Sequence, residues 1–317
     1  MIQWLQAADF HRKSAVLAPG AGTERGCINM KIIDQLHSGN RGLSCELFPP
    51  KEGGQLSNAL DIVREISTQG VDFVSVTYGA AGTAVGKSVA IVSEVEKCGM
   101  TGMAHLTCVN ATTPRIEETL GTLRAAGVEN ILALRGDLPA GMTLEHEEYR
   151  HASDLVKKIK DYGGFCVGGA CYPEGHPESA GLDDDIEKLK YKVDNGVDFL
   201  VTQMFFDNTI MYNYMYRLLA HGINVPVITG IMPVTNAKQI TRICKLSGTK
   251  LPLHFRAIVE KFADDPEAMK QAGICYATAQ ALDLLANGFK DVHIYTMNKP
   301  DVIGGMMKNL SHIVRHG

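Results

Sequence analysis

The sequence lacks the features that mark nucleic-acid-binding, membrane-spanning and zinc-binding proteins. Its formal net charge is −4 and its isoelectric point is near 6.3, so it has no basic excess for binding nucleic acid. No apolar run is long enough to cross a membrane. The eight cysteines form no CxxC pair, and Cys166 and Cys171 lie five residues apart in a strand-like segment. We therefore expect a cytoplasmic protein with reduced cysteines and with neither nucleic-acid nor membrane partners.

The first 42 residues also lack the continuous apolar core of a signal peptide, because they mix Gly-Ala-Gly with scattered charges. At Met30 the sequence Met-Lys-Ile-Ile-Asp-Gln-Leu-His begins a short amphipathic helix. A chain of 317 residues, 45% of them hydrophobic, could form two ordinary domains or one large α/β barrel. We expect residues 1–29 to be a disordered extension and residues 30–317 to form a single domain.

From residue 43 onward, short apolar runs alternate with stretches of helical periodicity. We predict strands at residues 43–48, 72–78, 103–109, 130–135, 165–172, 199–206, 226–232 and 292–297. We predict helices at residues 56–69, 88–97, 114–126, 152–162, 184–195, 209–221 and 237–246. Thr113 before Pro114 marks one helix start. Helix ends are marked by Gly70, Gly127, Gly196 and Gly222.

Eight strands that alternate with helices predict a (β/α)8 TIM barrel, in which the active site lies at the carboxyl ends of the strands. Extra helical sequence at residues 254–262 and 266–287 precedes the last strand. A barrel can accommodate such an insertion. We therefore predict that the domain at residues 30–317 is one catalytic barrel.

The stretch Ile-Leu-Ala-Leu-Arg-Gly-Asp-Leu-Pro, residues 131–139, shows what one strand end carries. Four apolar residues form a buried strand, and Pro139 prevents it from continuing. Arg135, Gly136 and Asp137 therefore stand where α/β folds place their chemistry. Alternatively, Arg135 and Asp137 only pair with each other in a loop.

Glu46 lies inside an apolar strand, two residues before Phe48-Pro49-Pro50. A buried carboxylate is unfavourable unless it has a partner or a raised pKa, so we interpret Glu46 as functional. Thr77 is β-branched and could equally be a simple strand former, and His105 could be a hydrogen-bonded core histidine. The barrel would bring further polar residues to the same face, namely Tyr172, Gln203, Asn298 and Lys299.

Residues 81–88, Ala-Gly-Thr-Ala-Val-Gly-Lys-Ser, offer an alternative function. They follow a strand, open a helix and nearly match a P-loop. In a P-loop protein Lys87 would bind a phosphate of the nucleotide and Asp207 would coordinate the magnesium ion. The pattern requires glycine where Ala81 stands, and a P-loop normally opens a doubly wound domain. A P-loop nucleotide hydrolase is therefore the second hypothesis, and a catalytically silent barrel within a larger assembly is the third.

Seven segments carry a family resemblance, and they are residues 44–50, 75–80, 105–108, 133–139, 172–177, 202–207 and 230–234. Their most specific motifs are Glu-x-Phe-Pro-Pro, Leu-Arg-Gly-Asp-Leu-Pro and Tyr-Pro-Glu-x-His-Pro, in this order and spacing. Together they closely resemble the flavin-dependent methylenetetrahydrofolate reductases. The resemblance extends from residue 43 to the carboxyl terminus.

This resemblance implies the fold, the cofactor and the reaction. The family uses a (β/α)8 barrel that holds FAD. NADH or NADPH reduces the flavin and leaves, and the folate then takes its place and receives the hydride. The reaction converts 5,10-methylenetetrahydrofolate to 5-methyltetrahydrofolate for methionine synthesis. The resemblance also implies a bacterial-type, homo-oligomeric enzyme without the domain through which S-adenosylmethionine inhibits eukaryotic relatives.

The resemblance assigns roles by position. Glu46 corresponds to the general acid that opens the five-membered ring, and Asp137 to a carboxylate near flavin and folate that stabilises a cationic iminium. Gln203, Asp137 and Lys299 correspond to folate-binding residues. The positions that resemble the flavin-contacting set are Thr77, Tyr78, Ala80, His105, Arg135, Gly136, Asp137, Tyr172, His176, Asp185 and Lys192. Arg135 and Lys192 are cations suited to the pyrophosphate, which would explain FAD binding without a GxGxxG loop.

Three positions depart from the family pattern. Ala237 stands where some relatives have a phenylalanine that contacts nicotinamide, and His151 stands where an aromatic hydroxyl is common near the flavin. Lys299 replaces an arginine near the folate glutamate tail, so a point charge replaces a bidentate fork. Donor affinity, polyglutamate preference and the choice between NADH and NADPH therefore stay open. Glu174 and His176 could suggest a metal site, but no complete ligand set is visible and we expect none.

Overall fold

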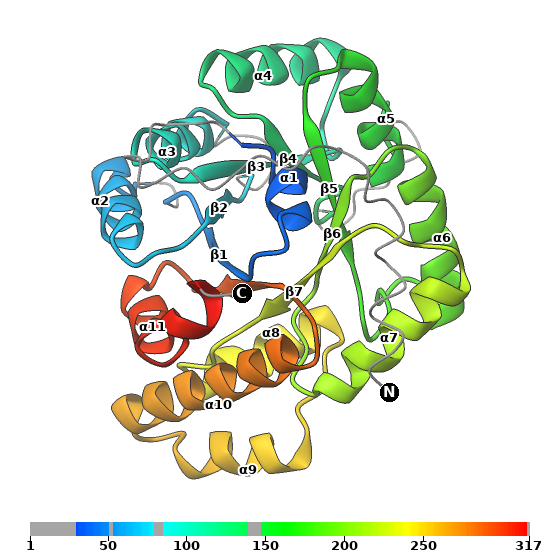
Figure 1. The fold of residues 1–317 in the computed structure, drawn as a ribbon. Helices are drawn as coiled ribbons and strands as arrows, with labels where there is room; N and C mark the ends of the chain where they lie inside the picture. Colours follow the sequence, from blue (N-terminus) through cyan, green and yellow to red (C-terminus); the bar gives the residue numbers. More distant parts are fainter. Residues whose placement is uncertain (1–29, 51–52, 79–84, 139–146, 316–317) are drawn as a thin grey trace, which may run out of the picture.

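The computed structural model describes residues 30–50, 53–78, 85–138 and 147–315, so the predicted extension at residues 1–29 lies outside the described residues. Eight parallel strands form a closed barrel, in which each strand pairs with the next in sequence and β8 pairs with β1 (Figure 1). The strands are β1 Gly42–Leu47, β2 Phe73–Val76, β3 Thr101–Thr107, β4 Asn130–Leu134, β5 Cys166–Cys171, β6 Phe199–Thr202, β7 Val227–Ile231 and β8 Asp291–Tyr295. The predicted TIM barrel is confirmed.

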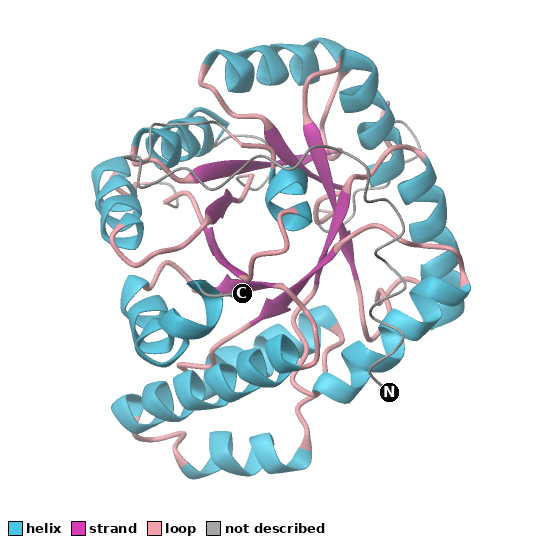
Figure 2. Cartoon of the chain, in the orientation of Figure 1, coloured by secondary structure: helices cyan, strands magenta, loops and turns pink. Residues whose placement is uncertain are grey.

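Helices surround the strands, most of them as an outer ring and the first over one end of the barrel (Figure 2). They are α1 Ile32–His37, α2 Leu56–Ser67, α3 Val85–Lys97, α4 Thr113–Ala125, α5 Ala152–Tyr162, α6 Leu182–Asp194, α7 Asn208–Ala220, α8 Ala237–Ser247, α9 Leu253–Lys261, α10 Pro266–Ala286 and α11 Pro300–Arg315. Helices α9 and α10 are the predicted extra material before the last strand. None of the helices in the described part of the chain is long and apolar enough to cross a membrane.

Most differences from the sequence-based elements lie at their ends. Helix α4 has Thr112 as its N-cap and Thr113 as its first residue, so the assignment of Thr113 as the cap was wrong by one position. The four glycine ends are confirmed, because Gly70, Gly127, Gly196 and Gly222 all adopt positive φ, between 71° and 112°. Helix α11 was not predicted.

Two apolar cores pack against the barrel wall, and a third cluster, which includes Met204, Phe206 and Phe255, lies between the loop after β6 and the helices α8 to α10. One lies between the outer faces of the strands and the surrounding helices. The other fills the amino-terminal half of the lumen and includes Phe73, Met103 and Phe199 from three different strands. Side chains alternate between the two faces of each strand, so every strand contributes to both sides of the barrel wall.

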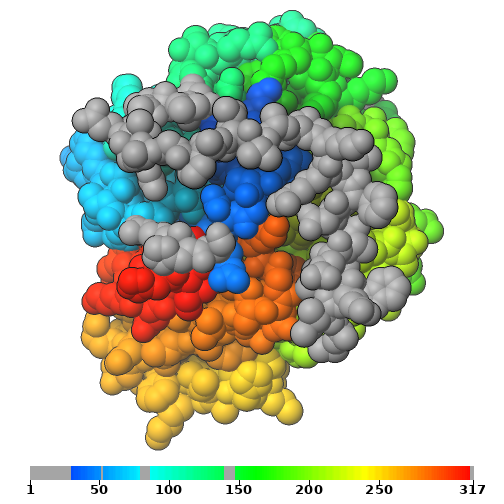
Figure 3. Space-filling model, in the orientation of Figure 1, coloured from blue at the N-terminus to red at the C-terminus, as the bar shows by residue number. Residues whose placement is uncertain are grey.

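Helix α1 closes the amino-terminal end of the lumen. Its Ile32 and Leu36 are buried against the lumen core, and the Ile32 N–H donates to Oδ1 of Asn130 at 2.8 Å. Gln35 donates to the hydroxyl of Thr101, the first residue of β3, at 2.9 Å. The space-filling view shows blue atoms of these first described residues at the centre of this face (Figure 3). Access to the lumen is therefore from the opposite end, where the strands end.

Strand β6 is four residues shorter than predicted. The N–H of Gln203 still donates to the Cys171 carbonyl of β5 at 2.7 Å, but side chains bind the next three carbonyls. Thr249 donates to the carbonyl of Met204 at 3.2 Å, Gln280 to that of Phe205 at 2.8 Å, and Tyr276 to that of Phe206 at 2.6 Å. Gln280 and Tyr276 belong to α10, and Thr249 follows α8. The helical insertion thus fixes the loop that begins with Gln203, directly after β6.

Candidate active site

Polar side chains fill the carboxyl-terminal half of the lumen. We name the following set the lumen cluster: Ser44 and Glu46 from β1, Ser75 from β2, His105 from β3, and His293 and Tyr295 from β8. The members of each strand are two positions apart, so they point to the same side of the barrel wall. His293 links two strands, because its Nδ1 lies 2.7 Å from the Ser44 hydroxyl and its Nε2 lies 3.1 Å from the Ser75 hydroxyl.

Glu46 and His105 face each other across the lumen, with 3.7 Å between Glu46 Oε2 and His105 Nε2. Burial raises the pKa of Glu46 to about 8 and lowers the pKa of His105 to about 3. Both groups are therefore neutral at pH 7, and their approach is not an ion pair. Glu46 is a carboxylic acid that retains a proton, with only 13% of its side chain exposed. It is equipped to donate that proton to a bound molecule.

The remaining lumen histidine is also neutral. Burial, with a smaller contribution from His105, lowers the pKa of His293 to about 3. His105 Nε2 is buried and has no hydrogen-bond partner among the described residues. An unsatisfied polar atom in this position favours a ligand with polar groups at the carboxyl ends of the strands.

Tyr295 crosses the lumen to reach β6. Its hydroxyl donates to the carbonyl of Thr202 at 2.6 Å, while the Thr202 hydroxyl accepts the N–H of Gly230 at 2.8 Å. A Cβ atom on Gly230 would lie 2.3 Å from the Thr202 carbonyl oxygen and 2.7 Å from the Tyr295 ring, so only glycine allows this approach. The contact fixes the end of β6, directly before Gln203. The side-chain Oε1 of Gln203 accepts the N–H of Met204, the next residue, at 2.9 Å.

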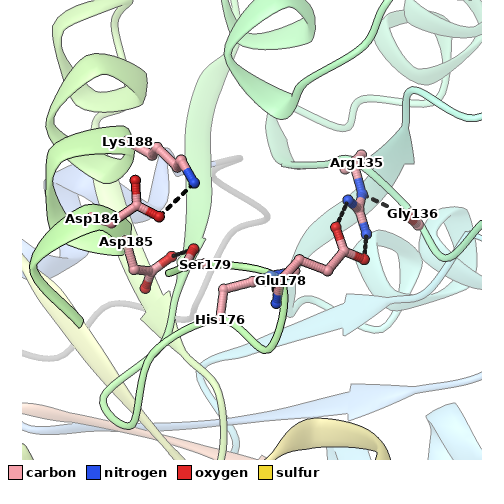
Figure 4. A network of polar contacts seen from close by, with 8 residues as sticks. All are labelled: Arg135, Gly136, His176, Glu178, Ser179, Asp184, Asp185 and Lys188. Atoms are coloured by element: carbon pink, nitrogen blue, oxygen red, sulfur yellow. Dashed lines mark hydrogen bonds and ion pairs between the residues drawn. The ribbon is translucent and has the colours of Figure 1, made fainter. Parts of the chain in front are cut away.

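A second group of residues lies on the rim of the barrel, after β4 and β5. We name Arg135, His176, Glu178, Ser179 and Asp185 the rim network (Figure 4). Arg135 donates to both carboxylate oxygens of Glu178, one at 2.8 Å. Asp185 accepts a hydrogen bond from the Ser179 hydroxyl at 3.3 Å. The alternative that Arg135 pairs with Asp137 is therefore wrong, since its ion-pair partner is Glu178.

Lys192 on α6 lies behind this rim. It is a half-buried cation that donates to the carbonyl of Ala170 in β5, and desolvation of its ammonium group lowers its pKa. Tyr172 and His176 meet edge to face at the end of the same strand, with ring centroids 4.7 Å apart. Two cations, aromatic rings and the unsatisfied His105 fit a group that carries both phosphates and a polar ring system. The residues present thus fit a flavin nucleotide.

The barrel brings most predicted site residues to one end. Thr77, Tyr78, Arg135, Gly136, Asp137, Tyr172 and Gln203 all follow directly after the strands, whereas Glu46 and His105 lie within strands. Gly136 adopts φ +88°, which glycine tolerates, and Asp137 is exposed. His176 lies in the loop between β5 and α6, and Asp185 lies in α6. Ala80 lies outside the described residues.

The positions that depart from the family pattern have ordinary structural partners. Lys299 donates to the hydroxyl of Thr235 at 2.7 Å and so joins the loops after β8 and β7. His151 is the N-cap residue of α5, and its carbonyl accepts the Cys108 thiol at 3.2 Å. Ala237 is the first residue of α8. Across the described residues, no group of three or more His, Cys, Asp or Glu side chains could hold a metal ion.

The P-loop hypothesis does not fit the fold. The sheet is a closed barrel rather than the open, doubly wound sheet that a P-loop opens. Lys87 lies in α3, and residues 81–84 are outside the described residues. Asp207 caps α7, because its Oδ1 accepts the N–H of Thr209 at 2.9 Å and its hydroxyl at 2.7 Å.

Four members of the lumen cluster were not identified from the sequence: Ser44, Ser75, His293 and Tyr295. A signal for two of them exists, because β8 alternates polar His293 and Tyr295 with buried Val292 and Ile294. Glu178 was also missed. It lies 43 residues from Arg135, so no local pattern could connect them.

A closed (β/α)8 barrel with a protonated acid in its lumen and cations at its strand ends has the architecture of a TIM-barrel enzyme. Residues 31–311 match the model of the methylenetetrahydrofolate reductase family. The chain belongs to this family.

Individual relatives agree with this assignment. The 5,10-methylenetetrahydrofolate reductase of Escherichia coli is 31% identical over 281 residues, which cover 88% of this chain and 93% of that protein. Methylenetetrahydrofolate reductase (NADH) 1 of Arabidopsis thaliana is 36% identical over 306 residues, 90% of this chain and 51% of that protein. The chain thus spans about half the length of this plant relative and of the fission-yeast one.

Solved structures share the fold at low sequence identity. A protein from Clostridium thermocellum that binds two copies of 5-methyl-5,6,7,8-tetrahydrofolic acid superposes with a TM-score of 0.61 at 13% identity, over 88% of this chain and 99% of that one. Tryptophan synthase from Mycobacterium tuberculosis gives a TM-score of 0.51 at 12% identity, over 90% of this chain and 97% of that one. These likenesses concern the barrel alone.

Proposed function

We propose that the protein is a 5,10-methylenetetrahydrofolate reductase that uses FAD and takes its electrons from NADH or NADPH in a ping-pong sequence. The observation that carries this proposal is the largely buried, protonated Glu46 at the carboxyl end of the barrel lumen. Family membership and the near full-length Escherichia coli relative support it. The folate bound by the Clostridium thermocellum protein is consistent with a folate substrate.

We propose that the rim network and its neighbours hold the cofactor. Arg135 and Lys192 would exchange Glu178 and the Ala170 carbonyl for the diphosphate. The other proposed cofactor residues are Thr77, Tyr78, Ala80, His105, Gly136, Asp137, Tyr172, His176 and Asp185. When bound, FAD supplies a two-electron carrier that accepts hydride from a nicotinamide and delivers it to the folate.

We propose that the lumen cluster and the exposed carboxylate of Asp137 perform the proton and charge chemistry. Glu46 gives its proton to the departing ring nitrogen of methylenetetrahydrofolate as that carbon–nitrogen bond breaks. The carbon left behind is part of a cationic iminium, which the negative charge of Asp137 stabilises until hydride reduces it to a methyl group. Gln203 and Lys299 orient the folate. Tyr295 supports this arrangement by holding the strand end before Gln203.

The test separates the two half-reactions in anaerobic stopped-flow experiments. Reduction of the flavin by the preferred nicotinamide needs no acid at the folate, so Glu46→Gln is expected to leave it nearly unchanged. Reoxidation by methylenetetrahydrofolate is expected to slow by about 10²–10⁴-fold, the range for loss of a general acid. Equal slowing of both steps would make Glu46 a structural residue, and no slowing would mean that another group is the acid.

A matched control is available at the opposite end of the barrel. Burial also raises the pKa of Glu96, to about 7, and its Oε1 accepts the N–H of Gly102 at 2.8 Å. Glu96→Gln removes an acid of similar pKa far from the proposed substrate, so both half-reactions should keep the parent rates. The same assay, run with NADH and with NADPH, identifies the donor.

A further inference from the structure

The chain leaves β8 in an unusual backbone conformation. Met297 and Asn298 are consecutive residues in the left-handed region, with φ of 55° and 58°, and neither is glycine. Residues other than glycine rarely adopt this region, although asparagine does so more often than most, and they persist there where the surroundings hold them. The conformation therefore needs a compensating interaction, and Asn298 supplies it.

The Asn298 side chain binds both backbone polar groups of Phe48. Phe48 N–H donates to Asn298 Oδ1 at 2.8 Å, and Asn298 Nδ2 donates to the Phe48 carbonyl at 2.9 Å. These bonds connect positions 250 residues apart in the sequence. The last residues paired between β1 and β8 are Glu46 and Tyr295. Beyond this pair, the side-chain amide of Asn298 makes the hydrogen bonds that a neighbouring strand would otherwise make with Phe48.

The same turn also holds the carbonyl of Glu46, because the Thr296 hydroxyl donates to it at 3.1 Å. Three hydrogen bonds from residues 296 and 298 therefore act on the backbone from Glu46 to Phe48. Pro49 and Pro50, the next two residues, have no N–H to donate, and residues 51–52 lie outside the described residues. Among the described hydrogen bonds at this strand end, those of Asn298 to Phe48 are the furthest along the chain.

We infer that Asn298 is a positioning residue that fixes the end of β1 and thereby the direction of the Glu46 carboxyl group. This inference rests on the proposed function, in which Glu46 must reach one nitrogen of the folate. A displacement of about 1 Å at a reacting group can cost about 100-fold in rate. Two hydrogen bonds that act two residues from Glu46 lie close enough to control such a displacement.

The test uses Asn298→Gly in the flavin-loaded protein. Glycine adopts φ near 58° without strain, so this variant removes the side-chain bonds while it preserves the turn. The matched control is Asn110→Gly, because Asn110 also has φ 58° and follows β3 at the same end of the barrel. Asn110 makes no bond to β1; its N–H donates to Glu147 at 3.2 Å.

Two measurements are made on each variant. Hydrogen exchange at the Phe48 amide reports the bond directly and does not depend on activity. Anaerobic stopped-flow gives the limiting rate of flavin reoxidation at saturating methylenetetrahydrofolate, together with the folate dissociation constant. For Asn298→Gly we expect amide exchange at Phe48 to become at least about 10-fold faster and the limiting rate of flavin reoxidation to fall by about 10–100-fold. The folate dissociation constant and the rate of flavin reduction should stay within about twofold of the parent values. Asn110→Gly should match the parent in all four quantities.

Several results would overturn the inference. Unchanged exchange at Phe48 would mean that Asn298 does not hold this backbone. Faster exchange with an unchanged limiting rate would mean that the bonds do not position Glu46, and equal slowing of both half-reactions would indicate general damage to the site. Failure of the proposed function is seen separately, because the parent protein itself would then not be reoxidised by methylenetetrahydrofolate.

Discussion

The lumen cluster and the rim network lie at the same end of one barrel but use opposite electrostatics. In the lumen, burial keeps Glu46, His105 and His293 neutral, and the contacts are hydrogen bonds between uncharged groups. On the rim, Arg135 and Glu178 stay charged, with 22% and 59% of their side chains exposed. Burial thus keeps the titratable side chains of the lumen neutral. On the rim, solvent exposure keeps Arg135 and Glu178 charged, so a charged ligand can replace Glu178 as the partner of Arg135.

Because the lumen is more tightly packed than the rim, we predict that it tolerates almost no increase in side-chain volume. Gly230→Ala would put a Cβ atom 2.3 Å from the Thr202 carbonyl oxygen, which belongs to the barrel wall and cannot move aside freely. We expect a loss of at least about 3 kcal/mol of unfolding free energy, or no soluble protein. Urea unfolding followed by circular dichroism measures it. Gly86→Ala in α3 is the control, because a Cβ there meets no atom of the described residues within 4 Å.

The second prediction concerns pH. Because the folded state raises the pKa of Glu46 from its ordinary 4.5 to about 8, folding keeps a proton that the unfolded chain releases. The contribution of Glu46 to stability is therefore fully present below pH 4.5 and is lost as the pH rises to 8. We expect the parent to lose up to about 4–5 kcal/mol relative to Glu46→Gln between pH 4.5 and pH 9, an upper value from the pKa change.

To test the second prediction, the unfolding free energies of the parent and of Glu46→Gln are measured across this pH range. The contributions of titratable groups that the two proteins share cancel when one free energy is subtracted from the other. A difference that does not change with pH would contradict it. His105 and His293 act in the opposite direction, because their lowered pKa values remove stability as the pH falls below 6.5. The Glu46→Gln protein should keep this acid-side loss.

The third prediction concerns the rim. Arg135→Ala removes an exposed ion pair, so the unfolding free energy without cofactor should change by less than about 1 kcal/mol. If Arg135 holds the diphosphate, FAD affinity should nevertheless fall by about 10-fold or more. Calorimetric titration of the cofactor-free protein with FAD provides the measurement. An unchanged affinity would remove Arg135 from the cofactor site.

The smallest effect is expected from removing residues 1–29. We predict that a chain starting at Met30 keeps its flavin and melts within a few degrees of the full-length protein, because α1 begins at Ile32 and already closes the lumen. Thermal unfolding followed by flavin fluorescence tests this prediction. Loss of flavin in the shortened chain would show that the extension contributes to the fold.

Local patterns in the sequence predicted the barrel well because each strand is a short buried run. They failed where the partner is distant. Strand β6 ends at Thr202, but its apolar continuation Met204–Phe206 looks like strand until the side chains from α10 are known. Helix α11 has a readable pattern, with Val302, Met306 and Leu310 buried at helical spacing, and was overlooked.

The candidate site divides in the same way. The lumen position of Glu46 could be predicted because a carboxylate within an apolar strand is costly, and desolvation there raises its pKa as this argument expects. Its role as the acid stays a prediction. The roles of Gln203, Lys299 and the cofactor residues depend on the family resemblance and stay predictions. The Arg135–Glu178 pair and the Asn298–Phe48 bonds arise from loop geometry, which no local pattern specifies.

The three carbonyls held after β6 also affect how the protein folds during synthesis. Their donors lie 45, 70 and 75 residues further along the chain, at Thr249, Tyr276 and Gln280. As the chain emerges from the ribosome, the segment after Gln203 therefore has to wait for most of α10 before these carbonyls are satisfied. Until then its apolar residues, Met204 to Phe206, are exposed to the solvent and to chaperones. The last third of the chain thus decides when this part of the barrel mouth becomes native.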